Sequence, residues 1–285
     1  MKLTHIYFSA WHATWNNRRM AIMLWFTTLI TAIPGYVMAY RTMGQYFGRT
    51  EVPSLWKNDF ELNYLFDLLI DQPSAGTIIS SVFGGAAIVS LILMIFLTGG
   101  IVAALIHPNE QNHFWHNCGK YFGRFFRLFL WNAVFVMIGI ALIPTHEYGW
   151  IITVILSGTA IMAGDIAKIR IVYNAHYSVT RMYFQSWRWV WQHVHHISEL
   201  YIANVIAFVA VFALYKYLDN GFVANSGLKL LMMIVLHQLF VCFRAMMRIQ
   251  FLAAPAELWK NLHYTVVPPR LKKTNILVAA PEYSN

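Results

Sequence analysis

Apolar and polar positions are segregated along this chain on the scale of whole helices, with long apolar runs between shorter polar segments. Because the hydrocarbon core of a bilayer is about 30 Å thick, a helix needs about 20 apolar residues to cross it. Six runs meet this requirement, namely residues 20–40, 76–106, 122–143, 150–171, 200–217 and 228–253. The second and sixth exceed the core thickness, so we expect each to tilt or to extend into the interface. The pattern predicts an all-α integral membrane protein with six transmembrane helices, built as one domain from residues 1–253.

Composition agrees with the pattern. Hydrophobic residues make up 58% of the 285 residues and charged residues 12%, and the mean hydropathy is +0.50. An average soluble domain is about half apolar and about a quarter charged. A soluble globule of this composition would lack the charge to cover its surface, and an aromatic content of 16% excludes a disordered chain.

The first apolar run has some features of a cleaved signal peptide. Arg18 and Arg19 precede it, and Val37-Met38-Ala39 resembles a cleavage site. The segment before the run is too long for such a leader, so we expect a retained first transmembrane helix.

The basic residues predict the orientation. Sixteen of the 21 lysines and arginines lie before residue 20, in residues 120–127, in residues 168–188 or after residue 243. These segments fall on one side of the six predicted spans, and basic residues favour the cytoplasmic side. We therefore expect both termini in the cytoplasm, which requires an even number of spans. The net charge of +9 then reflects loops facing anionic lipid rather than nucleic-acid binding.

Three segments outside the spans have amphipathic patterns. Residues 62–69 predict a short helix on the outer surface, either a cap over the bundle or part of a ligand site. Residues 113–129 and 183–196 combine aromatic and basic side chains, which predicts amphipathic helices in the cytoplasmic headgroup plane. Residues 254–285 contain four prolines and predict an extended cytoplasmic tail, which either binds a partner or is only a tail.

Small residues predict where helices pack. Small residues four apart let helix backbones approach closely in a membrane, where lipid offers no hydrophobic driving force. The second span and the fourth span carry such residues, and we expect these two spans to pack together. The candidate packing residues are Ser80, Ser81, Gly84, Gly85 and Gly158.

Four polar residues form a candidate intramembrane site. Asp165 is the one acid inside a predicted span, and Lys168 lies on the same helix face at i+3. The two form either a structural ion pair or part of a relay or substrate contact. His237 and Asn132 lie within the sixth and third spans, where they either join helices by hydrogen bonds or line a polar path.

Two groups of histidines raise the question of a metal. They are His107, His113 and His116 in one cytoplasmic segment and His193, His195 and His196 in the next. Their spacing departs from that of membrane-bound di-iron desaturases, so interfacial histidines are the expected interpretation and we expect neither metal nor cofactor. The sequence has no phosphate-binding GxxxxGK[ST] loop, no HExxH and no GxSxG. The two cysteines, Cys118 and Cys242, give no disulfide framework.

Several stretches resemble a group of uncharacterised bacterial inner-membrane proteins. The matching stretches are Thr98-Gly99-Gly100-Ile101, the aromatic and basic run of residues 118–127, and Asp165-Ile166-Ala167-Lys168-Ile169-Arg170. The resemblance covers residues 99–173 and the six-span layout. It implies a bacterial inner membrane and implies no activity.

The sequence favours a non-catalytic polytopic membrane protein, a subunit or accessory of a larger inner-membrane assembly. Its expected partners are the bilayer, including anionic lipids, and membrane-protein subunits. The first alternative is a permease or transporter component for a small or lipid-like substrate. The second is a membrane metalloenzyme that uses the cytoplasmic histidines.

Overall fold

The structure is a computed structural model that describes residues 3–46, 73–108, 113–145, 148–174, 177–221 and 227–266, and these residues contain helices and no strand. The elements in order are α1 (Leu3–Asn16), α2 (Arg18–Tyr46), α5 (Pro73–Ile106), α6 (Phe114–Leu142), the 3₁₀ turn η2 (Ile143–Thr145), α7 (Gly149–Tyr173), α8 (Val179–Gln192), α9 (Val194–Gly221) and α10 (Gly227–Val266).

Six of these helices are long and apolar enough to cross a membrane, which confirms the number of candidate spans predicted from the sequence. The candidate spans are Arg18–Met38, Gly76–Ile106, Phe114–Leu142, Gly149–Tyr173, Val194–Asp219 and Leu231–Leu262. The chain is therefore compatible with a multi-pass membrane protein. The predicted helix at residues 62–69 lies outside the described residues.

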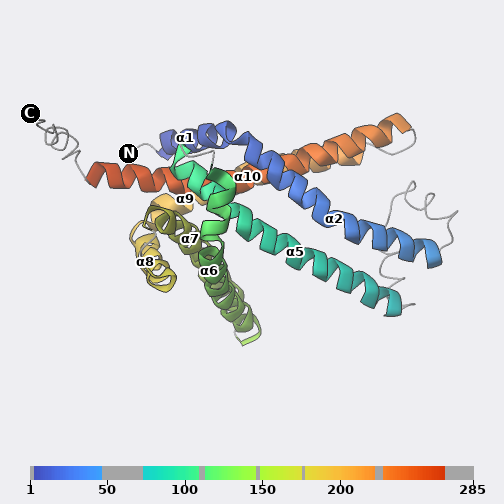
Figure 1. The fold of residues 1–285 in the computed structure, drawn as a ribbon, viewed down its shortest axis with the longest axis horizontal. Helices are drawn as coiled ribbons and strands as arrows, with labels where there is room; N and C mark the ends of the chain where they lie inside the picture. Colours follow the sequence, from blue (N-terminus) through green and yellow to red (C-terminus); the bar gives the residue numbers. More distant parts are fainter. Residues whose placement is uncertain are drawn as a thin grey trace, which may run out of the picture.

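The long helices form three antiparallel pairs, α2 with α5, α6 with α7, and α9 with α10. Figure 1 shows that one end of each pair meets the others near α1 and α8, and that the pairs diverge from there, with α2–α5 and α9–α10 running to the right of the view and α6–α7 running downward. We call the common end the hub; it comprises α1, α8, the start of α2, the first halves of α6 and α9, and the last halves of α5, α7 and α10. We call the diverging parts of the pairs the arms.

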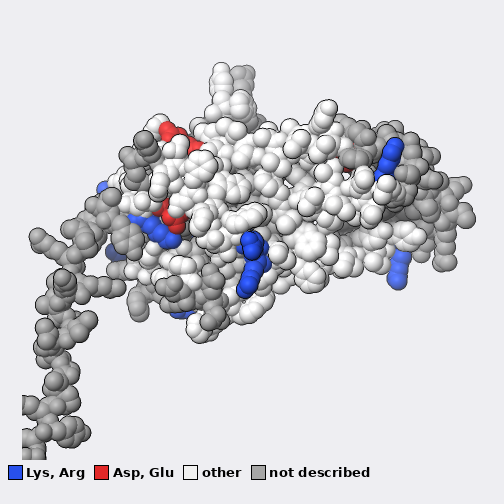
Figure 2. All heavy atoms as spheres, turned by 90° about the horizontal axis from the view of Figure 1, so that it is seen from above, with Lys and Arg blue, Asp and Glu red and all other residues white. Residues whose placement is uncertain are grey.

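The hub holds the core of the described chain. Its side chains interlock from several helices at once, and the fully buried ones include Ile101, Phe125, Ile169, Leu200 and Ile249. Apolar side chains on the arms are exposed instead. Figure 2 shows one face of the molecule, on which uncharged residues dominate and charged side chains are few. Arms that are apolar and exposed suit a hydrocarbon surrounding rather than water.

Two glycines of α5 let it touch α6. A Cβ on Gly99 would meet the backbone oxygen of Asn117 at 3.2 Å, and a Cβ on Gly100 would meet the Cys118 Sγ atom at 2.6 Å. The helices are therefore in backbone contact at this crossing, because a larger side chain at Gly100 has no room.

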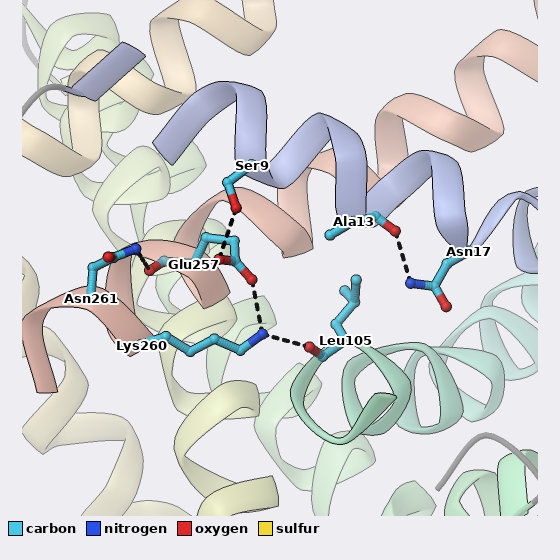
Figure 3. A network of polar contacts seen from close by, with 7 residues as sticks. All are labelled: Ser9, Ala13, Asn17, Leu105, Glu257, Lys260 and Asn261. Atoms are coloured by element: carbon cyan, nitrogen blue, oxygen red, sulfur yellow. Dashed lines mark hydrogen bonds and ion pairs between the residues drawn. The ribbon is translucent and has the colours of Figure 1, made fainter. Parts of the chain in front are cut away.

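A polar network ties α1, α5 and α10 together within the hub (Figure 3). The Lys260 Nζ atom donates to the Leu105 carbonyl oxygen, in the last turn of α5, and to the Glu257 carboxylate, each at 2.8 Å. The Ser9 hydroxyl donates to the other oxygen of Glu257 at 3.2 Å. A cation is favourable at a helix C-terminus because the carbonyl groups there lack intrahelical partners.

Helix α1 was not predicted from the sequence, yet it is part of the hub. It buries Ile6, Ala10 and Thr14 against neighbouring helices, and the Thr14 hydroxyl donates to the buried Gln250 side chain at 2.8 Å. The sequence pattern did not predict this helix because the helix is short and its apolar stripe is narrow. What defines it is the contact with α10, more than 230 residues away in sequence.

The structure differs from the sequence predictions in two helices. Residues 113–129 do not form a separate helix, since residues 114–142 are one continuous helix, α6. Helix α10 continues through Pro255 to Val266, so residues 254–266 are helical where an extended tail was predicted. Burial of Leu252, Ala254 and Leu258 in the hub core offsets the cost of a proline inside a helix, about 3 kcal/mol. Residues 267–285 lie outside the described part of the chain.

The other predicted surface segment is a separate helix, α8, although it begins and ends four residues earlier than expected. The Ser178 hydroxyl caps its start by accepting from the Arg181 backbone N–H. Tyr183 is fully buried, and its ring stacks on Trp131 and packs against Phe135, both of α6. This burial raises the pKa of the Tyr183 hydroxyl, which therefore stays protonated at neutral pH.

We expect Lys260→Met to lower the free energy of unfolding by about 2 kcal/mol, because it leaves the Glu257 carboxylate and the α5 terminus without their charged donor. The matched control is Lys216→Met. Its ion pair with Asp219 is longer, at 3.6 Å, and more exposed, so a change below about 0.5 kcal/mol is expected. Unfolding in detergent, followed by circular dichroism, measures both. Equal losses in the two variants would contradict the role of the network.

The turn between α6 and α7 gives a second prediction. A Cβ on Gly149 would collide with the Leu142 carbonyl oxygen and with the Ile143 backbone, whereas nothing lies within 4 Å of a Cβ on Gly158 of the same helix. Gly149→Ala should therefore destabilise the protein by about 1–3 kcal/mol. Gly158→Ala should leave stability unchanged or raise it by up to about 1 kcal/mol. The same unfolding measurement decides, and a neutral Gly149→Ala would show that the turn tolerates a side chain.

Candidate functional site

A buried carboxylate on α7 is the centre of the candidate site. Asp165 is 7% exposed, and the Lys168 Nζ atom lies 2.7 Å from its Oδ1 atom. The Tyr201 hydroxyl, from α9, donates to Oδ2 at 2.6 Å. Both carboxylate oxygens therefore have a donor, one of them charged, which is the condition for burying a carboxylate at tolerable cost.

Small residues on α7 make room for this arrangement. Ala160, Ala163, Gly164 and Ala167 are all buried around Asp165, so neighbouring helices can approach the α7 backbone closely. The i, i+3 spacing of Asp165 and Lys168 places both side chains on one face. The ion pair that the sequence offered as one interpretation is thus present, and Tyr201 joins it to the next helix pair.

One arginine of α10, Arg248, lies near this carboxylate, and a second, Arg244, lies near Arg248. Arg248 is within electrostatic reach of both Asp165 and Arg244. Arg244 and Arg248 also line a cavity of about 350 Å³ between α9 and α10, together with four apolar residues, Val205, Phe208, Met247 and Phe251. Phe251 packs against Tyr201 with ring centroids 5.7 Å apart, so the cavity adjoins the Asp165 cluster.

The charges of the site do not balance. Its one carboxylate, Asp165, is paired with Lys168 and hydrogen-bonded to Tyr201. Within the described chain, no hydrogen bond or ion pair reaches Arg244 or Arg248, and both side chains are exposed. Positive charge is therefore in excess here, because the two guanidinium groups on the cavity wall and the Lys168 ammonium share the single carboxylate of Asp165. Such a site suits an anion.

The structure does not bring His237 to this cluster. His237 precedes Arg244 on α10, and a rise of 1.5 Å per residue separates the two by about 10 Å along the helix axis. Its Nδ1 atom lies 3.1 Å from the Tyr215 hydroxyl of α9. Its neighbour Gln238 accepts from the Trp25 indole N–H of α2 at 3.0 Å. These contacts join α10 to two other helices.

Asn132 packs closer to the cluster. Its side-chain amide lies against Gly164, the neighbour of Asp165, in a space that a Cβ on Gly164 would fill. Its Oδ1 atom is buried and has no hydrogen-bond partner in the described chain. The same holds for both amide atoms of Asn204 on α9, one turn beyond Tyr201. Such buried, unpaired amide groups are uncommon in folded proteins.

The predicted packing residues lie on the arms. Nothing in the described chain comes within 4 Å of a Cβ on Gly84, Gly85 or Gly158. Ser80 is exposed, and Ser81 donates to the Ile78 carbonyl oxygen of its own helix. Among the described residues, close helix approaches occur at Gly100 and Gly164 in the hub, and also on the arms, at Gly35 against Phe83 and at Gly139 against Ser157.

The histidines at the junction of α8 and α9 make local contacts. His193 stacks on Trp189 at a centroid distance of 4.6 Å, and the His195 Nε2 atom lies 2.8 Å from the Glu199 carboxylate. Among the residues that the structure describes, no three His, Cys, Asp or Glu side chains are grouped so as to hold a metal ion.

Sequence reasoning missed three residues of the site. Tyr201 gave no local signal, because its partner lies 36 residues away on another helix. Arg244 and Arg248 were counted only for orientation, although their i, i+4 spacing within an apolar run was visible and could have marked them.

We expect Asp165→Asn to destabilise the protein by about 3 kcal/mol, because it leaves the part-buried Lys168 ammonium without its counter-ion. Tyr201→Phe removes one hydrogen bond to a charged group and should cost about 2 kcal/mol. Glu199→Gln, in an exposed pair on α9, is the control and should have little effect. Unfolding in detergent measures all three. A stable Asp165→Asn protein would contradict a structural ion pair.

Comparison with known protein families, with curated proteins and with solved structures finds no match to this chain.

Proposed function

We propose that this chain is a non-catalytic polytopic membrane protein that acts as a subunit or accessory of a larger membrane assembly. The observation that carries the proposal is the separation of the arms. In the apolar 18-residue segment that marks the α10 span as a candidate, only 11% is buried inside the protein. The corresponding share is 17% in the spans of α6 and α9. Each arm packs within its own pair, while the faces between pairs stay uncovered.

Membrane helices associate by close packing of small residues and by interhelical hydrogen bonds. In this chain small residues also pack within a pair on the arms, as Gly139 of α6 does against Thr153 of α7, but Gly84, Gly85 and Gly158 meet no described neighbour. Either lipid or helices of another subunit must fill the spaces between the arms. At these three glycines another helix can approach the backbone closely, which favours helices of a partner subunit over lipid.

The proposal places the hub at the cytoplasmic side of a bacterial inner membrane. The support is the distribution of basic residues, because Arg18, Lys120, Lys168 and Lys260 all belong to hub segments. Helix α8 then lies at the cytoplasmic interface, with the exposed Trp191 at the level of the headgroups. Both termini face the cytoplasm, and the resemblance over residues 99–173 supplies the bacterial membrane.

A second function is favoured by one observation, the cavity beside Asp165. A permease component for a lipid-like substrate would need a polar site within the apolar region, and Arg244 and Arg248 provide one. The position of His237 speaks against a continuous path, because its contacts with Tyr215 lie apart from the cluster. We therefore keep this function as the alternative.

Site-specific photo-crosslinking in intact membranes tests the assembly. A crosslinking residue at Ile88 of α5 or Val154 of α7, both more than half exposed on the arms, should yield a protein adduct of one reproducible mass. The control position is Phe8, exposed to a similar degree on α1 of the hub, which should not yield that adduct. Arm positions that give only lipid adducts would overturn the proposal, because lipid would then fill the spaces between the arms.

A further inference from the structure

Arg244 and Arg248 have a geometry that a single anionic group can satisfy. They are four residues apart on α10, so their side chains leave the same face of the helix about 6 Å apart along its axis. Both line the cavity between α9 and α10. A phosphate offers several acceptor oxygens and suits two guanidinium groups at once.

The described chain supplies no hydrogen-bonded counter-ion for this pair, and the one carboxylate within electrostatic reach of Arg248, Asp165, is shared with Lys168. Asp165 is bound to Lys168 and Tyr201, and neither arginine has a hydrogen bond or ion pair to another described residue. Both lie within the candidate span Leu231–Leu262. An unpaired arginine in a span is costly unless its guanidinium reaches water or lipid phosphate. The exposed side chains of Arg244 and Arg248 open toward the surroundings of the protein, where phosphate is available.

The depth of the pair agrees with lipid phosphate. Lys229 lies at the start of α10, and about 20 helical residues cross the hydrocarbon core. Counting 20 residues from Lys229 reaches the position after Arg248. Arg248 therefore falls at the opposite boundary of the core, next to the hub, and Arg244 falls one turn deeper. Lipid phosphates lie just outside this boundary, within reach of a long arginine side chain.

The remaining cavity wall is apolar. Val205 and Phe208 come from α9, and Met247 and Phe251 come from α10. A free inorganic anion would leave these side chains unused, and a neutral apolar ligand would leave the arginines unneutralised. An amphiphile with a phosphate and an acyl chain uses both. The cavity of about 350 Å³ holds only part of such a molecule, so its chains continue along the exposed surface of the arm, where Ile206 and Leu239 are 63% exposed.

We propose that the cavity between α9 and α10 binds one anionic membrane phospholipid, with its phosphate held by Arg244 and Arg248 and an acyl chain packed on Phe208 and Phe251. The lipid would neutralise the two guanidinium groups that the described chain leaves unpaired. Because the lining residues come from α9 and α10, the bound lipid would bridge the two helices of this pair. The inference does not depend on a partner subunit.

Native mass spectrometry of the purified full chain in an uncharged detergent tests the site. The probes are phosphatidylglycerol, phosphatidylcholine of the same chain length, and inorganic phosphate. We expect one phosphatidylglycerol molecule to bind more tightly than phosphatidylcholine. The double variant Arg244→Gln/Arg248→Gln should raise the Kd for phosphatidylglycerol at least tenfold, about 1.4 kcal/mol or more. The control Arg181→Gln/Arg188→Gln removes two exposed charges from α8 and should leave that Kd unchanged.

A second variant separates loss of the site from loss of the fold. Val205→Trp keeps both arginines and fills the cavity from a half-exposed position, so it should also weaken phosphatidylglycerol binding. Equal Kd values for wild type and the Arg244→Gln/Arg248→Gln variant would overturn the proposal. Equally tight phosphatidylcholine binding, or complete displacement of the lipid by millimolar inorganic phosphate, would overturn it as well, since the first outcome removes the preference for anionic lipid and the second identifies a free-anion site.

Discussion

The structure depends on the packing of six long helices at one end only. In the hub, side chains such as Phe125, Ile169 and Ile249 are excluded from the surroundings by several helices at once. No comparable core holds the arms together among the residues described. The direction of every arm is therefore set by contacts near one end of each helix. Those contacts are close because glycines such as Gly100 and Gly164 bring backbones together.

Long apolar runs made the architecture predictable. Length and hydropathy suffice to locate a membrane-spanning helix, because the bilayer fixes how many apolar residues it needs. The number of candidate spans and the i, i+3 pairing of Asp165 with Lys168 followed from such local rules. The boundaries were less certain, since the polar ends of α6 and α10 continue as helix wherever a neighbouring helix covers them.

What the sequence could not predict rests on contacts between distant residues. Helix α1 exists as part of the hub because Thr14 and Ser9 reach α10, and Tyr201 belongs to the site because α9 passes Asp165. No local spacing encodes either relation. The cavity was likewise invisible, because it needs the relative rotation of α9 and α10 to place Phe208 opposite Arg248. A periodic pattern shows which face of a helix is apolar, but it does not determine which other helix packs against that face.

The contact between α1 and α10 has a consequence for biosynthesis. Ser9 and Glu257 are separated by 248 positions, so the segment made first cannot reach its final partner until the last helix has left the ribosome and entered the bilayer. Contacts of such long range are slow to form, because the intervening chain must be ordered before they give any gain. The first two helix pairs can already meet where α5 crosses α6, but the face of α1 that packs on α10 stays without its partner until the last helix is made. Closure of the Ser9–Glu257 contact therefore belongs to the last stage of assembly.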